Sequence, residues 1–267
     1  MTGATDRSDL SATAALPEGF LEELLPELDS EEVVGIVLGG SFARGMATIL
    51  SDVDLALVVR EEAQVWPKRY FYHKGLLVSV AVKSIESVRA DMKDPLRATR
   101  VVPGISEVKI LTDSEGLLGD LMEELDHFRW ESLNEKAHRW VSYEMMTIAE
   151  QVQKVANECV RGNDPGVAYA VSKLLALLTT VITVHKGIMV KSDSTYYRQV
   201  YEAVGETSEW AKCHRRAAGL TEVGLNERAK ACLHLYQLTL DLVMPVMSEE
   251  QRQVAEGAAR RVSFMLV

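Results

Sequence analysis

The sequence predicts an α+β protein in two parts, an N-terminal mixed sheet with flanking helices followed by a C-terminal all-α helical bundle. Short apolar runs typical of buried strands, some ended by glycine, occur before about residue 128. After that point apolar residues recur at helical spacing over long stretches. The charge divides similarly, since residues 1–60 carry 11 acids and 3 bases whereas residues 131–267 carry 16 of each. We therefore expect domains at 16–128 and 129–267.

The N-terminal part is predicted to begin with a disordered segment, a helix and a strand. Residues 1–15 are small and polar, which is typical of disordered termini. Pro17 is expected to open a helix, because Phe20 and the leucines up to Leu28 recur at helical spacing. The apolar run at 33–38 ends at two glycines and predicts a buried strand.

The rest of the N-terminal part is predicted to mix strands and helices. Gly75 lies between two apolar runs and indicates the turn of a hairpin, and Ser84 has the position of a helix N-cap. Pro103 and Gly104 are expected to precede a strand. The predicted helices are 42–49, 85–92 and 117–125, and the predicted strands are 53–59, 69–72, 76–82 and 107–111.

The C-terminal part is predicted to be a bundle of antiparallel helices, because its helical segments are joined by short connections. Its first long helix carries an apolar stripe in steps of 4 and 3, formed by Val141, Met145, Ile148, Val152, Val155 and Cys159. A second helix is expected to begin at Asp164-Pro165 and to end at Gly187. Residues 225–243 predict a further long helix, and Ser248 caps the last one.

Composition limits the kinds of partner. The chain has 267 residues, a net charge of -10, 47% hydrophobic and 25% charged residues, which is typical of a soluble globular protein. The acidic balance argues against a nucleic-acid partner, since such binding requires a basic face. Three widely spaced cysteines indicate reduced thiols, and the start lacks a secretory signal, so we expect a cytoplasmic protein. Polar residues interrupt the apolar stretch 167–184, which predicts a buried helix and no membrane partner.

The segment 38–59 carries the chemistry of the chain. A strand ends at Gly39-Gly40-Ser41 and a short helix follows, so free backbone N–H groups point out of a glycine turn. Glycine allows a phosphate to approach the backbone, and a helix N-terminus favours its negative charge. Ser41 adds a hydroxyl donor. The turn therefore predicts a phosphate site, and the absence of a following glycine-lysine-serine/threonine excludes a Walker-type loop.

Two aspartates follow this turn. Asp52 and Asp54 are two residues apart on a predicted strand and so project from the same face. Mg²⁺ uses few protein carboxylates and takes its other ligands from water and phosphates. The order strand, Gly-Gly-Ser, helix, Asp-x-Asp, strand therefore predicts a Mg²⁺-nucleotide site.

These residues resemble the signature of the DNA polymerase β-like nucleotidyltransferase superfamily, in particular the small-molecule branch typified by aminoglycoside nucleotidyltransferases. The similarity rests on Gly39-Gly40-Ser41, Ala43-Arg44-Gly45 and Ser51-Asp52-Val53-Asp54-Leu55. It implies a helical bundle after the catalytic domain and a nucleoside triphosphate, which we expect to be ATP, as the donor. It further implies that Gly40 and Ser41 bind phosphates, that Asp52 and Asp54 bind Mg²⁺, and that a nucleoside monophosphate is transferred to a hydroxyl with release of pyrophosphate.

One position departs from the family pattern. The family places a third carboxylate on a later strand, and the matching strand here has Ser79 at that position. Serine at neutral pH neither binds Mg²⁺ strongly nor acts as a general base. Glu107 and Glu144 are the candidate substitutes, although a strand-start surface acid and a flanking salt bridge are the simpler interpretations of these two residues.

Basic residues extend the predicted nucleotide site. Lys191 and Arg198, in or just after the link that follows Gly187, are cations that could reach phosphates. Arg44, inside the motif, is a third candidate, or it holds the first short helix in place. The sequence thus predicts a Mg²⁺-dependent nucleotidyltransferase that modifies a hydroxyl of a small molecule, such as an antibiotic. The alternatives are a nucleotide-binding regulatory module without turnover, because of Ser79, and a transferase that modifies a protein or RNA.

Overall fold

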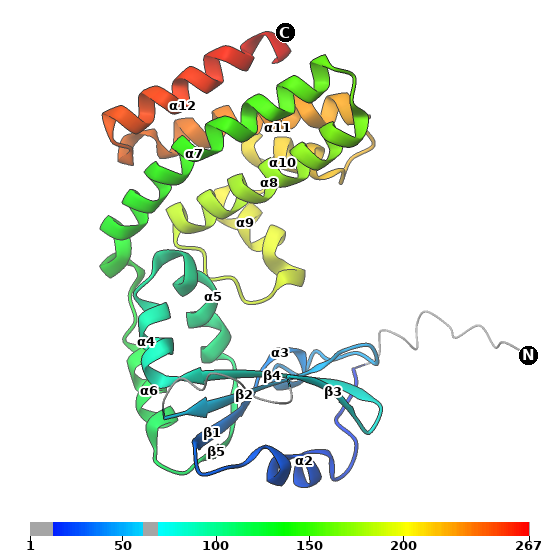
Figure 1. Cartoon of the computed structure of the whole chain (residues 1–267), viewed down its shortest axis with the longest axis vertical. Coiled ribbons are helices and arrows are strands. Elements are labelled where there is room, and N and C mark those ends of the chain that lie inside the picture. Colours follow the sequence, from blue (N-terminus) through cyan, green and yellow to red (C-terminus); the bar gives the residue numbers. More distant parts are fainter. Residues whose placement is uncertain (1–12, 61–68, 267) are drawn as a thin grey trace, which may run out of the picture. The chain divides into compact units, whose positions relative to one another are not determined.

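In a computed structural model the chain divides into two compact units, and the boundary along the sequence falls between Arg129 and Trp130 (Figure 1). The structure describes residues 13–60 and 69–266. The predicted disordered start, residues 1–15, lies outside this range except for residues 13–15, where the N–H of Ala14 donates to the carbonyl of Ala47 at 2.7 Å. Each unit has its own hydrophobic core.

The first unit is built on a mixed five-stranded sheet, as predicted. The strand order is β3-β4-β2-β1-β5. The central strand β2 is antiparallel to β1 and parallel to β4, and the edge strands β3 and β5 are antiparallel to their neighbours. The strands are β1 (Val33–Leu38), β2 (Val53–Val59), β3 (Tyr70–His73), β4 (Leu76–Ser84) and β5 (Lys109–Asp113).

Helices flank both faces of this sheet (Figure 1). On one face, α2 (Phe20–Leu28) buries Phe20, Leu24 and Leu28 against alternate residues of β1 and β2, such as Ile36 and Leu57. The opposite face carries α4 (Ile85–Met92), α5 (Pro95–Ser106) and α6 (Leu117–Asp126). Because strand side chains alternate between faces, residues 54, 56 and 58 of β2 point toward this second group of helices.

Several predicted elements of the first unit were wrong in extent, and one helix was missed. The first helix begins at Phe20 rather than at Pro17. The short helix α3 covers only Gly40–Ala43 rather than 42–49, because Gly45 adopts φ +69° and turns the chain. Helix α5 was not predicted, since Pro103 and Gly104 indicated a break. The helix accommodates both in its last turns, and the Asp94 carboxylate caps its start by accepting the N–H of Arg97 at 2.9 Å. As a result the last strand begins at Lys109.

The second unit is entirely helical, which confirms the predicted bundle. The apolar stripe of α7 is buried, with Val141, Met145 and Val152 fully covered, and it packs against α8, α11 and α12. Asn163, rather than Asp164, supplies the side-chain cap of α8 by accepting the N–H of Gly166. The helices are α7 (Asn134–Val160), α8 (Asp164–Lys186), α9 (Tyr196–Val204), α10 (Glu209–Ala218), α11 (Leu225–Val243) and α12 (Glu249–Val262).

Helix α8 is the one described helix that is long and apolar enough to cross a membrane. Of its most apolar window, 61% is buried inside the unit. Leu174 and Leu178, for example, are fully covered in the core shared with α7 and α11. These contacts identify α8 as the core helix of the bundle.

Candidate active site

The glycine turn lies directly against the second aspartate. The N–H of Gly39 donates to the carbonyl of Asp54 at 2.8 Å, which ties the end of β1 to the start of β2. Gly40 has φ +62°, a left-handed conformation that favours glycine. A Cβ at Gly40 would overlap the carboxylate of Asp54. The close approach of the Asp54 carboxylate and the left-handed backbone therefore both restrict position 40 to glycine.

The two aspartates differ in environment. Asp54 is the second residue of β2 and is half-buried, whereas Asp52 lies just before the strand and is exposed. Burial raises the pKa of Asp54, the negative charge of Asp52 raises it further, and Arg44 partly opposes both effects. Leu55 and Leu57 on the other face of the strand are buried in the core and fix its position. The site thus holds two acids whose charges repel each other.

Ser79 lies beside Asp54 in the sheet. Strands β2 and β4 run parallel, and their register pairs Asp54 with Ser79. Paired residues of neighbouring strands project from the same face. A hydroxyl therefore occupies the place next to Asp54 where the family resemblance leads us to expect a third carboxylate.

Glu107 is connected to this site through Arg44. A guanidinium nitrogen of Arg44, Nη1, lies 3.8 Å from Oε2 of Glu107, and both side chains are mostly covered, at 21% and 25% exposed. The sequence placed Glu107 at the start of a strand, but it is the C-cap residue of α5. The missed helix α5 is the reason for this error, because it carries Glu107 back toward the sheet.

Three predicted site residues belong to the second unit. Glu144 lies on α7 and is half-buried, and burial raises its pKa. Lys191 lies in the link between α8 and α9, and Arg198 lies on α9; both are exposed. Their roles toward the nucleotide stay predictions.

Tyr70 is a candidate site residue that the sequence analysis missed. Strand β3 pairs Tyr70 with Ser79, so Tyr70, Ser79 and Asp54 form a row on one face of three adjacent strands. The Tyr70 side chain is 73% exposed at the sheet edge. Its aromatic ring is available to stack on a flat substrate group. The hairpin register was the signal that could have identified it, but the register depends on where the turn begins.

The donor set fits a Mg²⁺ ion that shares its ligands with a phosphate. Among the described residues, no group of three or more His, Cys, Asp or Glu side chains is arranged to hold a metal. Asp52 and Asp54 supply two hard oxygen donors, and Mg²⁺ usually takes the remaining ligands from phosphates and water. The mutual repulsion of these carboxylates would be relieved by a cation.

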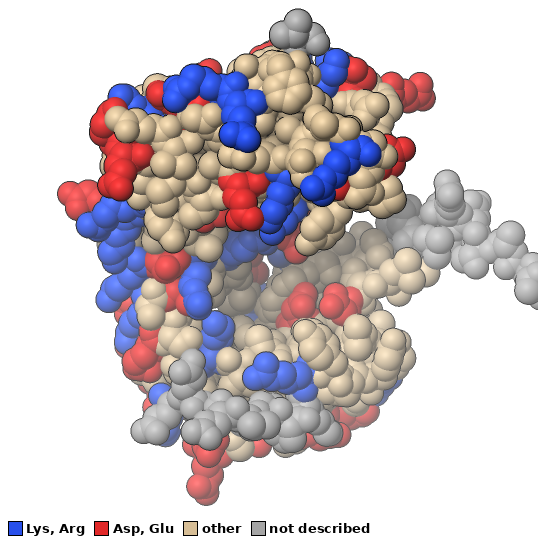
Figure 2. Space-filling view, turned by 45° about the horizontal axis from the view of Figure 1, so that its top comes forward, with Lys and Arg blue, Asp and Glu red and all other residues tan. Residues whose placement is uncertain are grey.

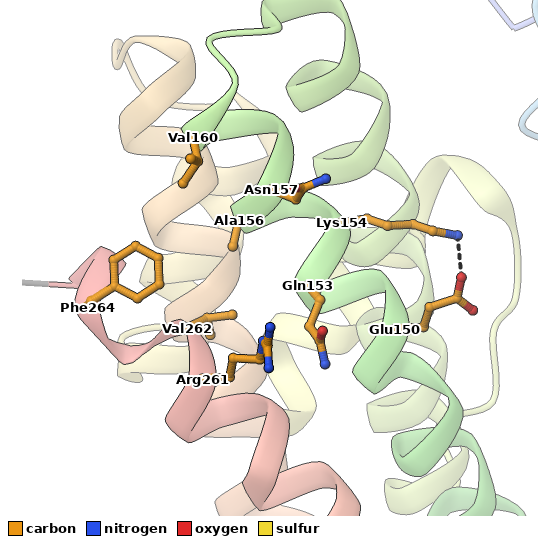
Figure 3. Close-up of a pocket in the computed structure, with 9 residues that line it drawn as sticks. All are labelled: Glu150, Gln153, Lys154, Ala156, Asn157, Val160, Arg261, Val262 and Phe264. Atoms are coloured by element: carbon orange, nitrogen blue, oxygen red, sulfur yellow. Dashed lines mark ion pairs between the residues drawn. The ribbon is translucent and has the colours of Figure 1, made fainter.

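The second unit contains a separate pocket of about 390 Å³ between α7 and the end of α12 (Figure 3). The ion pair between Glu150 and Lys154, 2.7 Å apart, lies at one side, and the apolar side chains of Val160 and Phe264 lie at the other. None of the predicted site residues lines this pocket. We therefore place the candidate active site at the glycine turn of the first unit.

Comparisons with known proteins identify a similar domain and a similar fold. Residues 21–102 match the family described as "Nucleotidyltransferase domain". The chain is similar in fold to the crystal structure of a nucleotidyltransferase-like protein from Exiguobacterium sibiricum 255-15, at 18% identity and a TM-score of 0.50, over 92% of this chain and 78% of that one. No curated protein matches this chain in sequence. The segment of the first unit that matches a nucleotidyltransferase domain, residues 21–102, therefore contains the glycine turn and both aspartates.

Proposed function

We propose that this protein is a Mg²⁺-dependent nucleotidyltransferase that transfers a nucleoside monophosphate from a nucleoside triphosphate, ATP in our expectation, to a hydroxyl of a small molecule. One observation carries the proposal. Within the segment that matches a nucleotidyltransferase domain, the Asp54 carboxylate packs against the backbone of Gly40, and the charge of Asp52 is near enough to raise the pKa of Asp54. A phosphate bound at the glycine turn would be adjacent to two carboxylates, which requires a bridging cation.

In the proposed reaction the chain acts mainly by positioning. The acceptor hydroxyl oxygen forms a bond to the α-phosphorus, and the bond between that phosphorus and the bridging oxygen of the β-phosphate breaks. Pyrophosphate leaves with that electron pair. The backbone N–H of Gly40 and the hydroxyl of Ser41 would hold the phosphates, and Arg44 would add a positive charge. The N–H of Gly39, also predicted to bind phosphate, instead donates to the carbonyl of Asp54. Bound Mg²⁺ would neutralise the triphosphate charge during this displacement.

The acceptor proton requires a base, and the chain offers two candidates. Glu144 is half-buried with a raised pKa, which suits a residue that must take up a proton near neutral pH. Glu107 belongs to the same unit as the glycine turn and forms an ion pair with Arg44. Ser79, although adjacent to Asp54, is suited to donate or accept a hydrogen bond rather than to take the proton.

A small-molecule acceptor is favoured over a nucleic acid. On the face shown in Figure 2, Lys and Arg side chains are intermixed with Asp and Glu side chains in both units. The net charge of -10 gives no electrostatic attraction for a polyphosphate chain. A single nucleotide differs from a polynucleotide in this respect, because one metal ion can bridge its phosphates to a carboxylate.

Ser79 favours a second candidate function, a nucleotide-binding regulatory module without turnover. The register places the serine hydroxyl beside Asp54. In this alternative the glycine turn and the aspartates bind a Mg²⁺-nucleotide, and the lack of a third acid prevents transfer.

Pyrophosphate release separates the two candidates. The purified full chain is incubated with Mg²⁺, each nucleoside triphosphate and a panel of hydroxylated acceptors. Acceptor-dependent release that is abolished in Asp54→Asn and retained in Asp29→Asn, an exposed carboxylate at the end of α2, supports the transferase. Tight Mg·ATP binding without release on any acceptor supports the regulatory module, and no detectable triphosphate binding overturns both. Glu107→Gln and Glu144→Gln then identify the base.

A further inference from the structure

A cavity of about 240 Å³ lies within the first unit and reaches Asp54 at one end. It is bounded by β1, β2 and β4 on one side and by residues of α5 and α6 on the other. Small side chains create the space, since Ala56 of β2 and Ala81 of β4 form its floor while larger residues stand around them. Ala56 and Ala81 are neighbours in register, two positions beyond the pair of Asp54 and Ser79.

The lining of this cavity is almost entirely apolar. Only Asp54, Ser79 and Lys83 among its lining residues have polar side chains. The ammonium of Lys83 is already held by Asp91 at 3.0 Å. Ile105, Val108 and Met122 are typical of the remaining wall. The cavity therefore has one polar end, at Asp54 and Ser79, and an apolar body.

From this arrangement we propose that the cavity holds an apolar portion of the acceptor, whose hydroxyl then lies at the Asp54 end; the proposal rests on the proposed nucleotidyl transfer. The substrate class is a hydroxylated small molecule that carries an aromatic ring or a compact aliphatic group next to the reacting hydroxyl. An apolar site of about 150 Å³ is large enough for benzene, so about 240 Å³ accommodates one ring with a short linker.

The chemistry of the lining argues against the triphosphate or the nucleobase of the donor as the group that fills the cavity. A triphosphate needs cations or N–H donors, and Lys83, the one cationic lining residue, is paired with Asp91. A nucleobase needs donors and acceptors around its edge, and burying those groups among Ala56, Val108 and Met122 would leave them without hydrogen bonds, which is unfavourable. An apolar group has no such cost, and covering its surface is favourable.

The first experiment tests binding independently of turnover. The full chain, labelled with ¹³C in its Ile and Met methyl groups, is titrated with 2-phenylethanol, and with ethanol as the polar comparison. We expect saturable shifts of the Ile105 and Met122 methyl signals with 2-phenylethanol only. Ala81→Leu fills the floor of the cavity from an exposed strand position and should weaken binding at least tenfold. Ala90→Leu, at an exposed alanine on α4 that does not line the cavity, should change it less than twofold.

Unmoved methyl signals, or unchanged binding in Ala81→Leu, would overturn the inference. So would a result in which ATP alone shifts the same methyl signals and Ala81→Leu weakens ATP binding, since the cavity would then be a nucleobase site. Thermal unfolding of both variants verifies that they remain folded.

The second experiment measures pyrophosphate release with acceptors that differ only in the apolar group next to the hydroxyl. Ala81→Leu should raise the KM for the apolar acceptor at least tenfold and leave the KM for ATP within twofold. Release that is independent of the apolar group and unaffected by Ala81→Leu would overturn the inference and leave the transferase intact. Saturable 2-phenylethanol binding without release on any acceptor would overturn the proposed function and support the apolar site.

Discussion

Gly40 and Asp54 show how closely two residues far apart in the motif depend on each other. Gly40 has φ +62°, and any side chain there would overlap the Asp54 carboxylate. Gly45, five residues later, has a similar φ of +69°, yet an added Cβ would meet nothing within 4 Å. A side chain at Gly45 would therefore cause backbone strain alone, whereas one at Gly40 would cause the same strain and also displace Asp54.

We expect Gly40→Ala and Gly45→Ala each to destabilise the protein by about 1–2 kcal/mol, because both force alanine into a left-handed conformation. Only Gly40→Ala should lower kcat/KM by about 100-fold or more, since a small displacement of Asp54 disturbs the reacting geometry. Chemical denaturation and pyrophosphate release measure the two effects. Equal losses of activity in the two variants would contradict this account of Gly40.

The raised pKa of Asp54 predicts a pH dependence of stability. Burial and the charge of Asp52 raise this pKa above the unfolded value of about 3.9. The folded state then binds the proton more tightly, so the stabilising contribution is present at low pH and is lost as pH rises through the raised pKa. In EDTA at pH 7, Asp54→Asn should therefore raise the Tm, and this gain should vanish below the unfolded pKa.

Mg²⁺ should have the opposite effect on the wild-type protein. A cation at Asp52 and Asp54 stabilises the ionised form, so Mg·ATP should raise the Tm of the wild-type chain at pH 7 but not that of Asp54→Asn. Mg²⁺ affinity should fall as pH drops through the raised pKa. A Tm for metal-free Asp54→Asn below the wild-type value would show that the aspartate pair is not repulsive.

At the scale of elements, an ion cluster joins three elements behind the site. The carboxylate of Asp91 on α4 accepts hydrogen bonds from Lys83 of β4 at 3.0 Å and from Arg97 of α5 at 2.7 Å. Asp91 is buried, which by itself raises its pKa, but the two cations outweigh burial and the pKa is lowered. The cluster thereby fixes α5, and with it Glu107 and the wall of the apolar cavity.

Asp91→Asn should destabilise the first unit by about 1–2 kcal/mol at pH 7. The loss is smaller than for a fully buried pair, because Lys83 and Arg97 are 44% and 63% exposed and remain solvated. Because the pKa of Asp91 is lowered on folding, its carboxylate stabilises the protein at pH values above its unfolded pKa. That stabilisation disappears as the pH falls through its folded pKa. Urea unfolding at pH 7 and pH 2 should show the difference at neutral pH only, with Glu123→Gln on α6 as the exposed control.

Strands and amphipathic helices could be predicted because their signals are local. Alternation and apolar runs identified β1, β2 and the hairpin of β3 and β4, and the stripe of Val141, Met145 and Val152 identified α7. Helix α5 could not be identified, because Pro103 and Gly104 oppose a helix locally and tertiary packing overrides them. Because this helix was missed, Glu107 was wrongly assigned to the start of a strand.

At the scale of the whole molecule, the two units have separate cores and different charge. The buried cluster of the second unit consists of residues from Ala137 to Val262, and that of the first consists of residues from Phe20 to Val80. Residues 131–267 are neutral, with 16 acids and 16 bases, so the acidity of the chain lies before them.

We expect a fragment of residues 130–267 to fold alone, because its helices bury their apolar faces on one another. Far-UV circular dichroism should show a helical spectrum and a single cooperative thermal transition. Leu178→Ala, at a fully buried position of α8, should destabilise the fragment by about 2–5 kcal/mol, whereas exposed Tyr169→Ala should change little. A fragment without a cooperative transition would show that the helical part depends on the sheet.

The sequence by itself determined the two-part architecture, the glycine turn and the paired aspartates, because periodicity, glycine and short-range spacing are local properties of the chain. Only the tertiary structure decided what surrounds Asp54. The parallel register brings Ser79 beside it, the fold of α5 returns Glu107 to Arg44, and two alanines on adjacent strands open an apolar cavity. These neighbours come from segments far apart in the chain, and strand register and helix packing bring them together.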